Sequence, residues 1–185
     1  MKKGIVFFII LFACPLIAGA YGMLHDQLTY TISPEYYTKF KFITFNVPEG
    51  MSERLRVCIV GFKAAWWTGV PIGMIMAPLG LIHRDERTML RVSFKAIGIV
   101  LLVTIITGLI GLFYGEFFLA THCTSPVKIK EYFDGWFIPD DVRDYKNYIS
   151  VGSMHNFTYL GGAFGLIVAA AYHLLVKSRY KKLVK

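Results

Sequence analysis

The chain has 185 residues, of which 55% are hydrophobic and only 17% are charged. Soluble domains are usually about 45–50% apolar and about 25% charged, so this composition excludes an ordinary soluble domain and indicates a membrane protein. The net charge of +8 comes from basic residues placed beside apolar segments, which argues against a nucleic-acid surface. Three cysteines are too few for a disulfide scaffold.

Four apolar segments are long enough to cross a bilayer, whose hydrocarbon core needs about 20 residues of helix. These segments cover roughly 4–24, 57–82, 96–121 and 153–176, with polar stretches at 25–56, 83–95 and 122–152 and a basic tail at 177–185. We therefore predict a single domain over 1–185. Its fold class is an all-α membrane protein, a bundle of four transmembrane helices with two outer loops of about thirty residues packed over its outer end.

The first apolar segment has two interpretations. A basic N-terminus and the small residues Ala18-Gly19-Ala20 fit the pattern of a cleaved secretory signal. The apolar stretch 4–20 is longer than the usual signal core of about 7–15 residues. This length favours an uncleaved first helix.

The two outer loops contain many aromatic residues. Residues 38–44 alternate apolar and polar side chains, which is typical of an extended, strand-like segment or of one lying on the membrane surface. Residues 131–148 combine aromatic side chains with acidic ones. We expect segments 33–50 and 131–148 to fold over the outer mouth of the bundle.

Small residues recur four apart in three of the predicted helices. They are Ala65, Gly69, Gly73 and Ala77, then Gly111 and Gly115, then Gly161, Gly165 and Ala169. In lipid, small residues allow helix backbones to approach closely. We therefore predict tight helix packing, and the same faces are also available to partner helices.

The distribution of Lys and Arg predicts that both termini are cytoplasmic. In this topology the inner side holds eleven of the twenty basic residues and only two of the twelve acidic ones, as the positive-inside rule requires. The expected location is the bacterial cytoplasmic (inner) membrane. A helically spaced stripe in the inner loop, together with the C-terminal tail, is predicted to contact anionic lipid headgroups; the stripe consists of Arg84, Arg87, Arg91 and Lys95.

Two ionisable residues fall inside the predicted spans, where such groups are costly and mark function by default. Lys63 and Glu116 lie at similar depths below the outer ends of the second and third helices, about 8–9 Å at 1.5 Å per residue. We predict that Glu116 pairs with Lys63 or with His155. Alternatively, the long side chain of Lys63 reaches the outer interface.

Histidines and acidic residues gather at the same outer level. His25 and Asp26 end the first predicted helix, His122 ends the third, and His155 begins the fourth. Helix bundles build ligand and metal sites from such side chains on separate helices. We predict a cluster that binds a ligand or a proton, formed by His25, Asp26, Lys63, Glu116, His122, His155 and Asn156.

If the cluster binds a metal, the candidate ligands are His25, Glu116 and His155. Imidazole and carboxylate groups suit zinc, iron or copper better than calcium. Without a metal, these residues form a hydrogen-bonded or proton-accepting cluster, or are interfacial side chains hydrated singly. The residues identify no cofactor.

Two further pairs are less distinctive. Cys58 and Cys123 fall at neighbouring outer ends of the second and third helices, where an oxidising compartment permits either a disulfide or unpaired thiols. His83 and His173 lie near the inner face and are expected to be ordinary interfacial residues.

Several short strings resemble small bacterial four-helix integral membrane proteins, and the resemblance implies no activity. The strings are His25-Asp26-Gln27, Ser33-Pro34-Glu35-Tyr36, Met154-His155-Asn156 and Tyr159-Leu160-Gly161-Gly162. No catalytic motif supports an enzyme. We expect a non-enzymatic polytopic membrane protein whose outer cluster binds or relays a small ligand, a proton or a metal. The alternative is a structural or assembly subunit of a larger envelope complex, with a membrane protein partner or a second copy of the chain.

Overall fold

The computed structural model describes residues 2–122 and 136–183, and this part of the chain contains helices and no strand. The four long helices are α1 (Lys3–Ile32), α4 (Glu53–Gly80), α5 (Glu86–Tyr114) and α7 (Tyr145–Leu183). A π-helical turn η2 (Gly115–Leu119) and a 3-10 turn η3 (Ala120–His122) extend α5. Four helical segments are long and apolar enough to cross a membrane, which confirms an all-helical chain with four candidate spans.

The helices extend beyond the apolar segments from which they were predicted. Helix α1 continues past residue 24 to Ile32, so His25 and Asp26 lie inside it and do not end it. Helix α5 begins ten residues early because the Asp85 carboxylate accepts a hydrogen bond from the Thr88 amide at 2.9 Å and caps the helix. Apolar length marks what a bilayer would cover, whereas backbone hydrogen bonds and caps decide where a helix ends.

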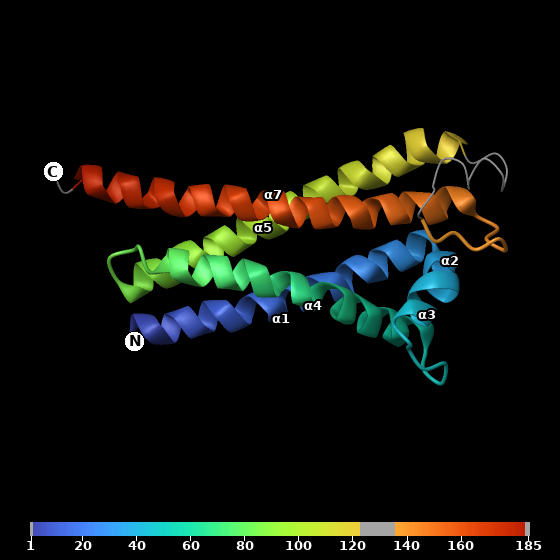
Figure 1. The fold of residues 1–185 in the computed structure, drawn as a ribbon, viewed down its shortest axis with the longest axis horizontal. Helices are drawn as coiled ribbons and strands as arrows, with labels where there is room; N and C mark the ends of the chain where they lie inside the picture. Colours follow the sequence, from blue (N-terminus) through green and yellow to red (C-terminus); the bar gives the residue numbers. More distant parts are fainter. Residues whose placement is uncertain (1, 123–135, 184–185) are drawn as a thin grey trace.

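The long helices form two antiparallel pairs, α1 with α4 and α5 with α7 (Figure 1). Glycine permits the close approach in both pairs. A Cβ on Gly69 of α4 would collide with the backbone of Cys14 in α1, and a Cβ on Gly165 of α7 would lie 2.9 Å from the Cα of Val100 in α5. The small-residue faces predicted from the sequence therefore pack within these pairs.

The two ends of the bundle differ. The start of α1 and the end of α7 lie with the α4–α5 turn at one end, which we call the terminal end, and the connection 33–52 lies at the opposite, loop end (Figure 1). A core at the loop end buries Tyr37, Val57, Val142 and Tyr148 from four separate segments. Residues 131–135 of the predicted segment 131–148 lie outside the described residues.

Residues 34–44, which we call the lid, are helical, so the prediction of an extended segment at 38–44 is wrong. The lid consists of α2 (Pro34–Tyr36), the π-helical η1 (Tyr37–Lys41) and α3 (Phe42–Thr44). Its first residue, Pro34, is pre-organised to begin a helix. Tyr37 and Lys41 are buried one wide turn apart, a spacing that the alternating pattern does not reveal.

Candidate functional site

The loop end brings His25 and Asp26 of α1 against His155 of α7. One ligand atom from each residue lies within 4.8 Å of the other two. Oδ1 of Asp26 is 4.0 Å from Nε2 of His155, and the ring centroids of His25 and His155 are 4.8 Å apart. Three predicted site residues thus converge from two helices of different pairs, and we call them the His–Asp–His cluster.

Burial of the cluster follows from the position of α1 in the bundle. His25 and Asp26 are consecutive, so their side chains leave the helix about 100° apart. Both are nevertheless buried, with His25 only 8% exposed and Asp26 only 2% exposed. Helix α1 must therefore be covered over a wide face, which α4, α7 and the lid provide together.

Two consecutive tyrosines of the lid enclose His155. The Tyr36 ring stacks on the imidazole with centroids 5.2 Å apart and an angle of 12° between the planes. The Tyr37 hydroxyl lies 3.5 Å from Nε2 of His155 and is hydrogen-bonded to Thr29 of α1. These tyrosines were not predicted as site residues; the helix-starting proline before them was the available signal.

A buried lysine of the lid supplies the positive charge that acts on the cluster. Lys41 is 6% exposed, and its Nζ lies 5.7 Å from the ring centroid of Tyr36. Burial lowers the pKa of Lys41, and the attraction of the Asp26 carboxylate offsets this only in part. Sequence reasoning missed Lys41 because it assigned this stretch to a loop segment with alternating exposure.

Two buried polar atoms of the cluster have no hydrogen-bond partner among the described residues: Nε2 of His25 and Oδ2 of Asp26. Buried polar groups in proteins are nearly always hydrogen-bonded, and leaving one unsatisfied costs about 1–3 kcal/mol. An imidazole nitrogen and a carboxylate oxygen left unpaired on consecutive buried residues can accept a proton or bind a cation.

Glu116 lies outside the cluster. Its carboxylate forms an ion pair with Lys146 of α7, while Lys63 donates a hydrogen bond to the Phe45 carbonyl at 3.1 Å. The predicted contact of Glu116 with Lys63 or His155 is therefore wrong. The physical reason is that α5 pairs with α7, so this glutamate meets the first turns of α7 and does not meet α4.

Two other predicted site residues also lie apart from the cluster. Nδ1 of His122, at the exposed end of η3, lies 3.0 Å from the Phe118 carbonyl. Asn156 is exposed and lines a separate cavity of about 270 Å³ whose walls include Trp136 and Tyr148.

For Cys58 and Cys123 the sequence left a disulfide or unpaired thiols open; Cys58 is a free cysteine in the structure, and Cys123 lies outside the described residues. Its proposed partner, Cys58, lies on α4. There, its Sγ accepts a hydrogen bond from Nε2 of Gln27 at 3.1 Å.

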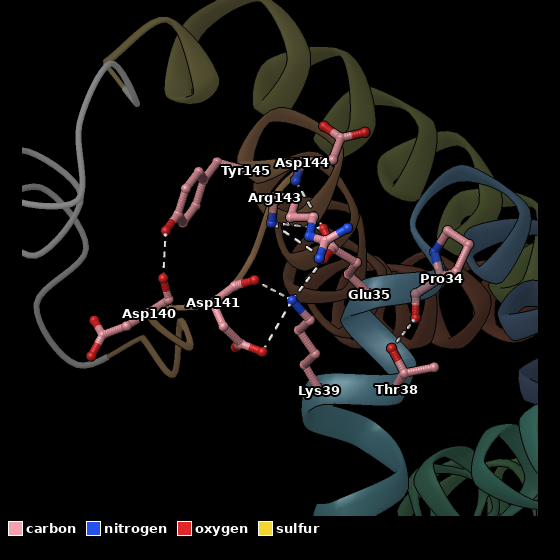
Figure 2. Close-up of polar contacts among 9 residues, drawn as sticks. All are labelled: Pro34, Glu35, Thr38, Lys39, Asp140, Asp141, Arg143, Asp144 and Tyr145. Carbon is pink, nitrogen blue, oxygen red and sulfur yellow. Dashed lines mark hydrogen bonds and ion pairs between the residues drawn. The ribbon is translucent and has the colours of Figure 1, made fainter.

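Polar contacts connect the lid to the segment that leads into α7 (Figure 2). The Glu35 carboxylate accepts hydrogen bonds from the amides of Arg143 and Asp144, at 3.0 and 2.8 Å, and pairs with Lys39 at 2.8 Å. Lys39 also pairs with Asp141 at 3.2 Å. This network holds the lid against α7, next to the cluster.

A second histidine pair occupies the terminal end. Nε2 of His83 lies 3.0 Å from Nδ1 of His173, and both residues are buried, so the expectation of ordinary interfacial residues is wrong. Nζ of Lys3 donates to the His83 carbonyl at 2.6 Å. Burial lowers the pKa of His83, and the nearby Lys177 and Lys3 lower it further. The His83–His173 contact joins the α4–α5 turn to α7.

Comparisons with protein-family models, with curated proteins and with solved structures give no match for this chain. Function is therefore inferred from the His–Asp–His cluster and its surroundings.

Proposed function

We propose that the chain is a polytopic, non-enzymatic protein of the bacterial cytoplasmic (inner) membrane that binds or relays a small ligand at the His–Asp–His cluster. The ligand class is a proton, a metal ion or another small solute. In this proposal both termini are cytoplasmic, so the loop end, with the lid and the cluster, faces outward.

The charge distribution supports this orientation. A stripe of exposed basic residues lies at the terminal end, and it consists of Arg84, Arg87, Arg91 and Lys95. The C-terminal part of α7 adds the exposed Arg179 and the half-buried Lys177 there. Cytoplasmic loops are enriched in Lys and Arg, and such clusters bind anionic lipid headgroups.

One observation carries the proposed ligand site. Nε2 of His25 and Oδ2 of Asp26 are buried, adjacent and without hydrogen-bond partners among the described residues. Asp26 lies near His155 and interacts with the buried Lys41, so acidic and basic side chains are buried together at this site. Ionisable groups buried within a membrane segment mark function by default.

Thermal unfolding of the purified full chain in detergent tests the proposal. The unfolding midpoint is measured across pH and with Na⁺, K⁺, divalent metals, small anions and small amines. A ligand that binds only the folded protein raises the unfolding midpoint. At a ligand concentration of one hundred times Kd, the free energy of unfolding increases by about 2.7 kcal/mol. We expect at least one condition to stabilise the wild type and Glu116→Gln, the matched control, but not Asp26→Asn or His155→Gln.

A different outcome would assign the chain to another class. If no ion, solute or pH change gives a stabilisation that depends on Asp26 and His155, the cluster has no ligand. The chain is then a structural or assembly subunit, and its co-purifying membrane protein partner or self-association becomes the measurement of interest.

A further inference from the structure

We propose that the ligand of the His–Asp–His cluster is a divalent first-row transition-metal ion, bound by His25, Asp26 and His155 with one coordination position left open. This inference rests on the proposed function and narrows it to one ligand class. It replaces Glu116, the carboxylate that sequence reasoning placed in the candidate metal set, with Asp26.

The donor set decides the class of metal. Two imidazole nitrogens and one carboxylate oxygen suit zinc, iron, cobalt, nickel and copper, whereas calcium and magnesium prefer oxygen ligands. The unpartnered Nε2 of His25 and Oδ2 of Asp26 supply lone pairs that the protein itself does not use. His155 completes the set from the opposite helix pair.

The geometry requires only small side-chain movements. Metal–ligand distances of about 2.0–2.2 Å around a tetrahedral centre separate the ligand atoms by about 3.4 Å. One ligand atom from each of the three residues already lies within 4.8 Å of the other two, and Oδ1 of Asp26, the carboxylate oxygen other than the unpartnered Oδ2, is 4.0 Å from Nε2 of His155. Small rotations of the side chains within their staggered rotamers can shorten each distance between ligand atoms by roughly an ångström.

Three protein ligands leave the fourth position open. Structural zinc sites usually have four protein ligands, whereas sites that bind an exchangeable molecule keep one position free. The Tyr37 hydroxyl of the lid, 3.5 Å from Nε2 of His155, is a polar group beside the cluster. The fourth position of the bound metal would therefore be free to bind an exchangeable small molecule.

Lys41 competes with the metal for the same carboxylate. Its ammonium is the positive charge that acts on Asp26 without a metal, and a divalent ion bound there would be repelled by it. Opposite and like charges interact strongly where water is excluded. Metal binding should therefore strengthen when Lys41 is replaced by the uncharged, similarly long methionine.

Cobalt(II) is a suitable probe because its visible spectrum reports coordination. The purified, metal-stripped full chain in detergent is titrated with Co²⁺ and then with Zn²⁺ in competition. We expect one Co²⁺ per chain, four- or five-coordinate bands, and displacement by Zn²⁺. Asp26→Asn and His155→Gln should weaken binding by at least about 100-fold, since even indirect partners of a metal ligand are worth about 10–100-fold.

Two further variants make the test specific. Asp26→Cys should add a thiolate-to-cobalt charge-transfer band, which appears only if the side chain at position 26 binds the metal directly. Lys41→Met should tighten Co²⁺ binding by about tenfold, whereas Glu116→Gln should match the wild type. Helical circular dichroism and a single size-exclusion peak check that each variant is folded.

The outcomes separate this inference from the proposed function. Equal Co²⁺ affinity in folded Asp26→Asn, or no charge-transfer band in folded Asp26→Cys, overturns the metal site. If neither Co²⁺ nor Zn²⁺ binds but another ion, solute or pH change still stabilises the protein through Asp26 and His155, the metal inference fails and the proposed function stands. If nothing binds, both fail.

Discussion

At the residue scale, Asp26 and Lys41 place opposite charges inside the loop end of the molecule. Asp26 is on α1 and 2% exposed, and Lys41 is on the lid and 6% exposed. Burying one charge costs several kcal/mol, and a buried pair adds little net stability even when well arranged. Stability therefore does not explain why Asp26 and Lys41 are buried together. A role in ligand binding does explain it, and for this reason we place the ligand site beside them.

The His83–His173 contact should make stability depend on pH. Burial, Lys177 and Lys3 hold the pKa of His83 below its ordinary value of 6.5, so the unfolded chain binds more protons than the folded one as the pH falls. Stability is then greatest above about pH 6.5 and decreases as the pH falls below it. We expect the unfolding midpoint of the wild type to drop more between pH 8 and pH 5 than that of His83→Gln.

His122→Gln provides the control for that measurement, since it removes an exposed histidine at the other end of the molecule. Its unfolding midpoint should follow the wild-type pH dependence. If His83→Gln loses as much stability on acidification as the wild type, the histidine pair does not bind its proton differently in the folded state.

At the element scale, the Glu35 network should hold the lid closed. Hydrogen bonds from Lys39 and two backbone amides outweigh partial burial and lower the pKa of Glu35 below its ordinary 4.5, so this stabilisation is present above that pH and lost as the pH falls through the folded pKa. Exposed ion pairs contribute about 0.2–1 kcal/mol. We expect Glu35→Gln to speed hydrogen exchange in 34–44 roughly two- to fivefold at pH 7.

Glu49→Gln is the matched control for the lid, because Glu49 is exposed on the same connection. It should leave the exchange rates of 34–44 unchanged. Equal rates in wild type and Glu35→Gln would mean that the buried aromatic residues alone hold the lid in place.

The helix pairs depend on glycine at particular positions. A Cβ at Gly69 would overlap the backbone of Cys14 and Pro15, whereas a Cβ at Gly98 meets nothing within 4 Å. Overpacking costs about 1–3 kcal/mol, while alanine in an open helical position is favoured over glycine by up to about 1 kcal/mol. Gly69→Ala should therefore lower the unfolding midpoint in detergent, and Gly98→Ala should leave it unchanged or raise it. A loss of the same size in both variants would contradict this account of helix pairing.

At the scale of the whole molecule, the membrane topology is directly testable. Reporter fusions after Arg87 and after Lys185 should both report cytoplasm, because the exposed basic residues lie at the terminal end. Fusions after Thr44 and after Asp140 should report the outer side. A fusion after Arg87 that reports the outer side would invert the orientation and place the His–Asp–His cluster toward the cytoplasm.

The sequence by itself determined the four candidate spans and the shared level of His25, Asp26 and His155. Both follow from local properties: apolar length sets which segments are long enough to cross a bilayer, and helical rise sets the depth of each residue. The composition also predicted a membrane protein. None of these conclusions depends on which helices are neighbours.

The tertiary structure alone decided which helices pair and what covers the site. In a membrane helix the lipid-facing and protein-facing sides are both apolar, so hydrophobic periodicity does not record the neighbour. For this reason Glu116 was predicted to pair with Lys63 or His155, although α5 packs on α7 and Glu116 pairs with Lys146. The lid was predicted as extended for a related reason: the burial of Tyr37 follows from its contacts with Thr29 of α1 and His155 of α7, which no local pattern in 34–44 contains.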